Sequence, residues 1–483
     1  MRKNILNTII LAMFSLTLIS CNDYLSNKPK GYSIPEYYDD YAVLLNGEDL
    51  SSFGVNYPAL LTDDIVIGGS EGVPSAASIV SKQASEQGCY TFKKGDLFPK
   101  GTNDHFYSYG YKHIYTYNVI INNILNVPDG VEEDKHKLRA EALTHRAFTY
   151  LQLVNVYAKH YDKNSAATDY GVPIILTEDI NSTYERNTVQ EVYNLILADL
   201  KEAVLYLADA TNNSFHPNKT TAYGLLARTY LYMGEYELAL ESAKTALKLN
   251  KTNALIDYKK YHAMPEGYWD RIVDNEGQTF PQRGENIENL FVKLPPNDMA
   301  SEYFASDDLL SLFPKNLPKG AIDKRFEMFY AKDRANTVED MLFPGYTMYI
   351  AHIMPNVGIT LQEIYLTLAE CEARIVAGTA TQATAYLDIL RNNRIVNNKP
   401  LVAVSKDEAL CMALDERRKE MAFWAQMRYI DLKRLNKEEK FAKTIVHTLE
   451  GKTYTLPAND NRWIMPLPHS VREFNPSIPQ YER

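Results

Sequence analysis

Between Lys219 and Leu249 the sequence carries two runs of apolar and small residues, separated by a turn at Gly234-Glu235. Within each run these residues recur every three or four positions, which is the spacing of one face of an α-helix. They are Tyr223, Leu226, Ala227 and Tyr230 in the first run, and Ala239, Ala243 and Ala246 in the second. Small residues at the facing positions let two helices pack closely. Such a pair buries its apolar face only by stacking on a neighbour, which constrains the chain to a helical-repeat fold.

The spacing is that of a tetratricopeptide repeat, and it recurs in the chain. Glu363 to Arg394 carries the same pattern with a turn two residues longer, and a looser copy begins at Arg139. Its partner helix is expected at Thr188 to Leu207, after a long insertion. The fold class predicted is therefore all-α, a tetratricopeptide-like helical repeat scaffold. We expect its helices at about residues 104–160, 188–249 and 361–435.

Three long insertions interrupt the helices: Ser51 to Asn103, Lys159 to Asn187, and the proline-dotted segment Lys251 to Leu361. Connections of that length are rare in compact domains and are usually functional. We therefore expect a large, irregular, loop-rich layer over the scaffold, with ligand-binding insertions at about 51–103 and 251–360. Residues 46–483 would form a single domain.

The N-terminus has the layout of a secretory signal peptide, predicted to span residues 1–20. Arg2 and Lys3 precede a run from Ile5 to Ile19 that carries no charge. The run ends in Leu18-Ile19-Ser20-Cys21, which resembles the lipobox of bacterial lipoproteins. That resemblance makes Cys21 the site of lipid attachment and residues 21–45 a tether and N-terminal segment. The alternative is an uncleaved anchor helix with a cysteine there by chance.

Charge and motif content narrow the function classes. The formal net charge is −10, and no basic stripe suited to nucleic acid is visible. The four cysteines include no CxxC pair, and Glu141 and His145, one helical turn apart, are too few to predict a metal site. No P-loop or dinucleotide fingerprint is present, so no metal or cofactor is expected.

Catalytic signals are weak. Gly68 to Gly72 matches G-x-S-x-G, but Val73-Pro74 follows where a nucleophile elbow needs a helix. The pairs Asp63-Asp64 and Asp307-Asp308 could suggest a glycosidase, yet adjacent side chains usually diverge. We predict that the protein is not an enzyme.

A segment near the C-terminus predicts buried ion pairs. On one continuous helix, Arg418 and Arg428 would share a face with Leu414, Met421, Ala425 and Leu432. Buried guanidinium groups must be paired, and the expected partners are Glu420, Asp431, Glu370 and Glu372. A structural network is the favoured interpretation, because no nucleophile or base accompanies these arginines.

Several of these segments together resemble the SusD/RagB family of nutrient-binding outer-membrane lipoproteins, over nearly the whole chain. They are Cys21 to Leu25, Arg139 to Tyr150, Leu226 to Leu231, the residues Glu416-Arg417-Arg418, Glu420, Phe423, Arg428 and Asp431-Leu432, and the proline-rich end from Pro466 to Gln480. One departure is visible, because Trp424-Ala425 stands where the family commonly has Glu-Gly.

The resemblance implies a lipid-anchored protein on the outer face of the outer membrane. It would bind an oligosaccharide, or a peptide in RagB-like members, and deliver it to a SusC-like TonB-dependent transporter. Aromatic residues in the insertions are candidate ligand contacts: Tyr90, Phe92, Tyr268 and Trp269. Trp424 and Trp463 are expected to pack inside. The rival hypothesis is a helical-repeat scaffold lipoprotein of the envelope that binds no small ligand.

Overall fold

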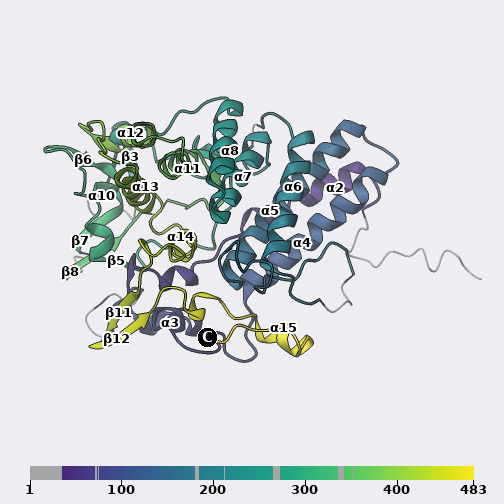
Figure 1. Cartoon of the computed structure of the whole chain (residues 1–483), viewed down its shortest axis with the longest axis horizontal. Coiled ribbons are helices and arrows are strands. Elements are labelled where there is room, and N and C mark those ends of the chain that lie inside the picture. The colour runs from purple at the N-terminus through teal and green to yellow at the C-terminus, as the bar shows by residue number, and fades with distance from the viewer. Residues whose placement is uncertain are drawn as a thin grey trace, which may run out of the picture.

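The computed structural model describes residues 35–70, 73, 76–179, 184–211, 213–264, 272–334, 342–351 and 353–483. Figure 1 shows the helices in a curved row that follows chain order, from α4, α5 and α6 through α7 and α8 to α11, α12 and α13. Their bounds are α2 (Tyr38–Leu45), α3 (Ala84–Tyr90), α4 (His105–Asn123), α5 (Glu132–Tyr157), α6 (Val189–Tyr206), α7 (Lys219–Met233), α8 (Tyr236–Leu249), α11 (Leu361–Arg374), α12 (Ala380–Arg394), α13 (Lys406–Glu420) and α14 (Met427–Leu435). The predicted helical-repeat scaffold is confirmed.

The pair α7 and α8 forms as its spacing predicts. Asn218 caps α7 by accepting a hydrogen bond from the backbone N–H of Thr221. Gly234 ends the helix at φ +78°, a conformation that glycine adopts without steric cost. Ala227 and Ala239 are both buried, which allows the close approach of the two helices.

The neighbouring units use the same devices. Thr188 and Glu191 form a reciprocal capping box at the start of α6, while Thr360 and Thr379 cap α11 and α12. Helix α11 packs against α8, α12 and α13, so the repeats form one continuous stack. The largest hydrophobic cluster of the described residues extends from Tyr41 in α2 to Ile478 near the C-terminus, and two smaller clusters accompany it.

The second layer contains short antiparallel ladders as well as loops. A four-stranded sheet has the order β1-β5-β8-β7, and four two-stranded sheets accompany it. The strands are β1 (Ile65–Val66), β2 (Tyr261–Ala263), β3 (Ile272–Asp274), β4 (Asn289–Phe291), β5 (Phe304–Ala305), β6 (Ile322–Asp323), β7 (Tyr330–Arg334), β8 (Leu342–Tyr349), β9 (Ile359–Thr360), β10 (Ile395–Val396), β11 (Ile445–Leu449) and β12 (Lys452–Leu456). Strands of two to eight residues leave little periodicity for sequence analysis to detect.

Smaller helices complete the layer: α9 (Asp307–Leu310), α10 (Lys324–Phe329), α15 (His469–Phe474), and the 3₁₀ turns η3 (Glu48–Ser51), η4 (Tyr57–Leu61), η5 (Ile79–Ser81), η7 (Tyr258–Lys260), η8 (Arg283–Glu285) and η9 (Asn461–Trp463). The turn η6 (Ile124–Asn126) instead follows α4 directly and packs against α5 in the scaffold. In Figure 1 the layer lies below and to the left of the helical row. No helix among the described residues is both long enough and apolar enough to span a bilayer.

The continuous helix expected from Leu414 to Leu432 is wrong. Helix α13 ends at Glu420, and α14 begins at Met427 after a tight turn. Two residues of that turn, Phe423 at φ +62° and Ala425 at φ +46°, have left-handed backbone conformations. A left-handed residue cannot continue a right-handed helix, so the chain changes direction here.

Candidate functional site

Three of the residues predicted to have a function lie outside the described part of the chain. They are Cys21, the expected lipid attachment site, and the aromatic pair Tyr268 and Trp269. Their roles stay predictions.

Tyr90 and Phe92 are buried, with 1% and 2% of their surfaces exposed. Both rings pack against the imidazole of His447, at centroid distances of 4.3 and 4.6 Å. The hydroxyl of Tyr90 accepts a hydrogen bond from the backbone N–H of Ile67. His447 is fixed by the carbonyl oxygens of Tyr90 and Thr62. The structure therefore corrects the expectation for this pair, because packing occupies the ring faces that a ligand would need.

Arg418 and Arg428 are paired, but not with the predicted partners. Arg418 donates to Asp64 and Asp308, each at 2.7 Å, and Arg428 donates to both oxygens of Asp63 at 2.9 and 2.8 Å. Although burial opposes ionisation of Asp63, Arg428 and Arg418 hold its pKa well below the usual range. The three aspartates come from the insertions, so this cluster fastens the second layer to α13 and α14.

Three of the expected carboxylates pair with other arginines, and the fourth, Glu372, pairs with Lys244 at 2.9 Å. Arg434 contacts both oxygens of Glu370 at 2.6 and 2.7 Å. Arg417 contacts Asp431 at 2.7 Å, and Glu420 pairs with arginines of α10 and α12. The network joins elements far apart in the sequence, which is a structural role.

The described part of the G-x-S-x-G segment, Gly68 to Ser70, does not follow the layout of a nucleophile elbow. Strand β1 before it has two residues and pairs antiparallel with β5. The backbone N–H and the hydroxyl of Ser70 both donate to the Glu450 carboxylate, at 2.9 and 2.7 Å. The carboxylate thus fixes this loop against the β11–β12 hairpin.

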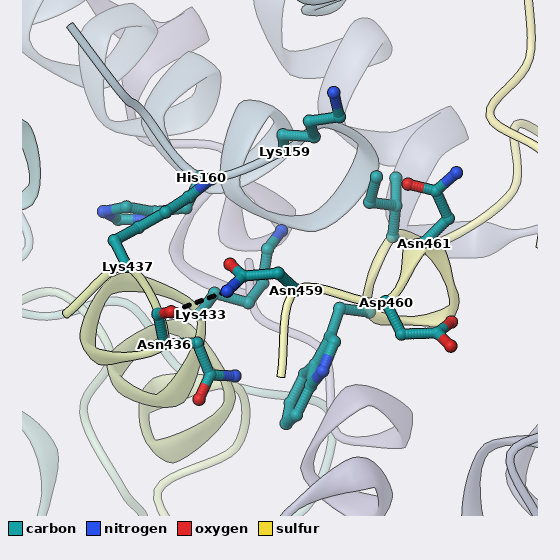
Figure 2. Close-up of a pocket in the computed structure, with 10 residues that line it drawn as sticks. Lys159, His160, Lys433, Asn436, Lys437, Asn459, Asp460 and Asn461 are labelled. Carbon is teal, nitrogen blue, oxygen red and sulfur yellow. Dashed lines mark hydrogen bonds between the residues drawn. The ribbon is translucent and has the colours of Figure 1, made fainter. Parts of the chain in front are cut away.

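A polar hollow lies where the C-terminal ends of α5 and α14 meet the loop that contains η9 (Figure 2). The cavity within this hollow has a volume of about 40 Å³. The lining residues come from these three segments and are Lys159, His160, Lys433, Asn436, Lys437, Asn459, Asp460, Asn461, Trp463 and Ile464. We call this the α5–α14 hollow.

Lys433 anchors the hollow to the scaffold. Its ammonium donates to the carbonyl oxygens of Asn155 and Ala158 at the end of α5. These carbonyls have no partner within the helix, and they carry the negative end of its dipole. Burial, together with nearby Lys437, holds the pKa of Lys433 well below its usual range.

Amide groups line the rest of the hollow. Asn459 donates to the carbonyl oxygen of Asn436 at 2.7 Å, the dashed contact in Figure 2. The buried Nδ2 of Asn436 has no hydrogen-bond partner in the described structure. The indole of Trp463 is buried and donates to the carbonyl oxygen of Pro457 at 2.9 Å, so it forms a fixed wall.

A second cavity of about 350 Å³ adjoins the first and shares His160 and Lys437 with it. It extends past Tyr161 and Asp162 to the Gly234 turn between α7 and α8. Its size falls in the range of small-molecule sites. Sequence analysis missed this hollow, and the only local signal is the polar run Asn459-Asp460-Asn461.

Among the described residues no group of three or more His, Cys, Asp or Glu side chains is arranged to hold a metal ion. Glu141 instead contacts His216 Nδ1 at 2.9 Å. His145, one turn along α5, lies in a different cavity from the α5–α14 hollow.

Two family models match the chain. Residues 66–231 match one described as "Starch-binding associating with outer membrane", and residues 359–482 match one described as "SusD family". Together the two segments cover more than half of the chain. A curated relative, SusD-like protein P2 from Formosa agariphila, is 29% identical over 240 residues. That match covers 47% of this chain and 43% of the relative, so the chain spans less than half of its length.

Solved structures share the fold. A SusD superfamily protein from Bacteroides thetaiotaomicron superposes with a TM-score of 0.69 at 22% identity, covering 92% of this chain and 100% of its own. A protein from Bacteroides vulgatus whose name describes it as sugar-binding superposes with a TM-score of 0.66 at 22% identity, covering 93% of this chain and 99% of its own. A laminarin binding SusD-like protein superposes with a TM-score of 0.58 at 19% identity, covering 90% of this chain and 96% of its own.

Proposed function

Because the chain belongs to the SusD/RagB family, we propose that it binds a glycan and delivers it to a SusC-like TonB-dependent transporter in the outer membrane. The lipid on Cys21 would hold it there, facing the exterior. Its action is recognition without bond cleavage. The laminarin-binding protein of similar fold supports a glycan over a peptide as the ligand class.

We place the glycan in the α5–α14 hollow, and the observation that carries this placement is the chemistry of its lining. Sugars present hydroxyl groups that both donate and accept hydrogen bonds. The unpartnered Nδ2 of Asn436 and the side chains of Asn461 and Lys437 supply matching groups. The adjoining cavity has room for a sugar ring beside Tyr161.

Binding can be measured by calorimetry against a panel of neutral glucans and peptides. We expect a glucan to bind. The variants Asn461→Ala and Lys437→Ala should each lower the affinity for it at least tenfold, because each change removes a side chain that lines the hollow. The matched control is Asn123→Ala, at the exposed end of α4, which should bind as the wild type does.

Each alternative has a distinct outcome. If affinity falls in Trp269→Ala and is unchanged in Asn461→Ala, the ligand lies in the insertion predicted from sequence and not in the hollow. Binding of peptides alone would identify a RagB-like member. If no glucan or peptide in the panel binds, the result favours the scaffold hypothesis. Release of shorter sugars from a bound glucan would identify an enzyme.

Delivery to the transporter is tested by affinity purification from solubilised outer membranes. We expect a TonB-dependent barrel protein to copurify with the full chain in stoichiometric amount. Asn461→Ala should retain the barrel while losing glycan, since the hollow contacts the ligand. Absence of any barrel protein from the purified material contradicts the delivery role and leaves the glycan-binding proposal standing.

A further inference from the structure

A separate cavity of about 270 Å³ lies among the end of α2, helix α5, the loop before α7 and the segment after β4. It shares no lining residue with the α5–α14 hollow. Its lining includes His145, Lys293, His216 and Arg283. Two basic side chains and two imidazoles therefore line one partly open cavity.

His145 lines this cavity with only 2% of its surface exposed. Its ring stacks on Tyr117 at 5.3 Å and meets the edge of Phe291 at 5.1 Å, so the orientation of the imidazole is fixed. Neither Nδ1 nor Nε2 has a hydrogen-bond partner among the residues that the structure describes. Buried polar atoms are nearly always satisfied, so this pair of nitrogens indicates a place for a polar ligand.

Lys293 lines the same cavity and is 1% exposed. Its ammonium donates to the carbonyl oxygen of Leu50 and lies 5.3 Å from the ring centre of Phe291. Within the described chain no carboxylate lies at ion-pair distance from it. Burial lowers the pKa of Lys293 to about 7. A buried cation without a counter-ion is costly, and an anion entering the cavity would remove that cost.

Two described carboxylates near the cavity already have partners. Asp49 pairs with Lys112 at 2.8 Å, and Glu141 pairs with His216 at 2.9 Å. Arg283 is exposed at the mouth of the cavity. Among the described residues that line the cavity there is no Asp or Glu, so Lys293 and Arg283 bring positive charge that no described carboxylate pairs with.

We propose that this cavity binds a small hydroxylated carboxylic acid, such as a sugar acid. Its carboxylate pairs with the Lys293 ammonium, and Arg283 attracts it at the mouth. A neutral imidazole has one donor and one acceptor nitrogen. His145 can thus donate to the carboxylate and accept from a hydroxyl, which favours a hydroxy acid over a simple anion. The site does not depend on glycan binding in the α5–α14 hollow.

The test is calorimetry of the full chain at pH 7 with glucuronate, glucose and inorganic phosphate. We expect glucuronate to bind at least tenfold more tightly than either of the others, and added salt to weaken it. Lys293→Met and His145→Phe should each reduce its affinity at least tenfold, since methionine keeps the length of the lysine and phenylalanine keeps a flat ring, while both changes remove the polar atoms. Lys244→Met, on the exposed face of α8, is the matched control and should not change it.

Because Arg283 is exposed, its replacement leaves the interior unaltered. Arg283→Ala should lower the affinity for glucuronate at least threefold. Equal affinities for glucose and glucuronate overturn the proposal, as does glucuronate binding that Lys293→Met leaves unchanged in a folded protein. Phosphate that binds as tightly as glucuronate, and with the same dependence on Lys293, overturns the hydroxy-acid assignment. Asn461→Ala should leave glucuronate affinity unaltered, because that residue lies in the other hollow.

Discussion

At Lys293, burial opposes charge, and the balance shifts with pH. Burial lowers its pKa to about 7, whereas in the unfolded chain an ordinary lysine titrates near 10.4. Between these values the unfolded chain holds a proton that the folded protein has released. The stability contributed by this residue therefore rises as the pH increases from about 7 to 10.

Lys293→Met makes that contribution measurable. Methionine fits the apolar surroundings without the penalty for a buried charge, so at pH 6 the variant should be the more stable protein, by up to about 4 kcal/mol. The difference should shrink toward pH 10. Urea denaturation at several pH values measures it, and a difference that does not vary with pH contradicts the low pKa.

Ala425 shows a second conflict at the residue scale. It is buried and has φ +46°, at the position where the family commonly has glycine. A left-handed conformation costs an L-residue roughly 1–2 kcal/mol, and a β-branched residue tolerates it least. The methyl group of alanine recovers part of this cost through packing.

Ala425→Val should destabilise the fold by about 2 kcal/mol or more, because it adds crowding to backbone strain. Ala425→Gly should change stability by less than about 1 kcal/mol, since relief of strain offsets the lost methyl contact. Chemical denaturation of both variants tests this. A valine variant as stable as the glycine variant would show that the turn can relax.

At the scale of elements, helices α11 and α14 are joined by Glu370. Burial opposes its ionisation, yet Arg434 and Arg374 lower its pKa to about 2. A carboxylate with a depressed pKa stabilises the fold above its unfolded pKa of about 4.3, and this stability is lost as the pH falls toward 2. The link between the two helices is therefore sensitive to acid.

Glu370→Gln keeps the shape and removes the charge. At pH 7 we expect the free energy of unfolding to fall by about 3 kcal/mol, because two buried arginines lose their counter-ion. Near pH 2 the variant should differ little from the wild type. Glu372→Gln is the matched control on the same helix, where the partner Lys244 is half exposed and the loss should be smaller. Thermal or urea unfolding across this pH range gives the comparison, and equal losses in the two variants would refute the role of Glu370.

At the scale of the whole molecule, the lipid that we propose on Cys21 would decide where the protein resides. Several acyl chains would contribute about 0.8 kcal/mol for each buried CH₂ group, which would make such an anchor effectively permanent. Cys21→Ala should move the protein from the outer-membrane fraction to a soluble fraction and abolish labelling with palmitate.

Cys411→Ala supplies the control, since that thiol is partly exposed but lies on α13. It should stay in the membrane fraction and keep its label. Fractionation followed by immunoblotting measures both. Membrane retention of the Cys21 variant would support the alternative of an uncleaved anchor helix.

The helical scaffold could be predicted because its signals are local. The small residues Ala227 and Ala239, the turn at Gly234 and the spacing of their neighbours all lie within one short segment. Helix periodicity depends on residues three or four apart, so a single sequence carries it in full. The match between Glu416 and Leu432 indicated the family for the same reason, although the break at Ala425 required the backbone conformation to be known.

Only the tertiary structure decided which distant segments meet. Periodicity places Arg418 on a buried face, but the partner, Asp64, lies 354 residues away and comes from an insertion with no period. The same limit explains why Tyr90 and Phe92 proved to be interior and why Asn436 and Asn461 share a hollow. Sequence determined the helices and predicted the N-terminal signal, because both depend on neighbours along the chain. Packing between remote segments determined the cavities, because burial and charge pairing depend on neighbours in space.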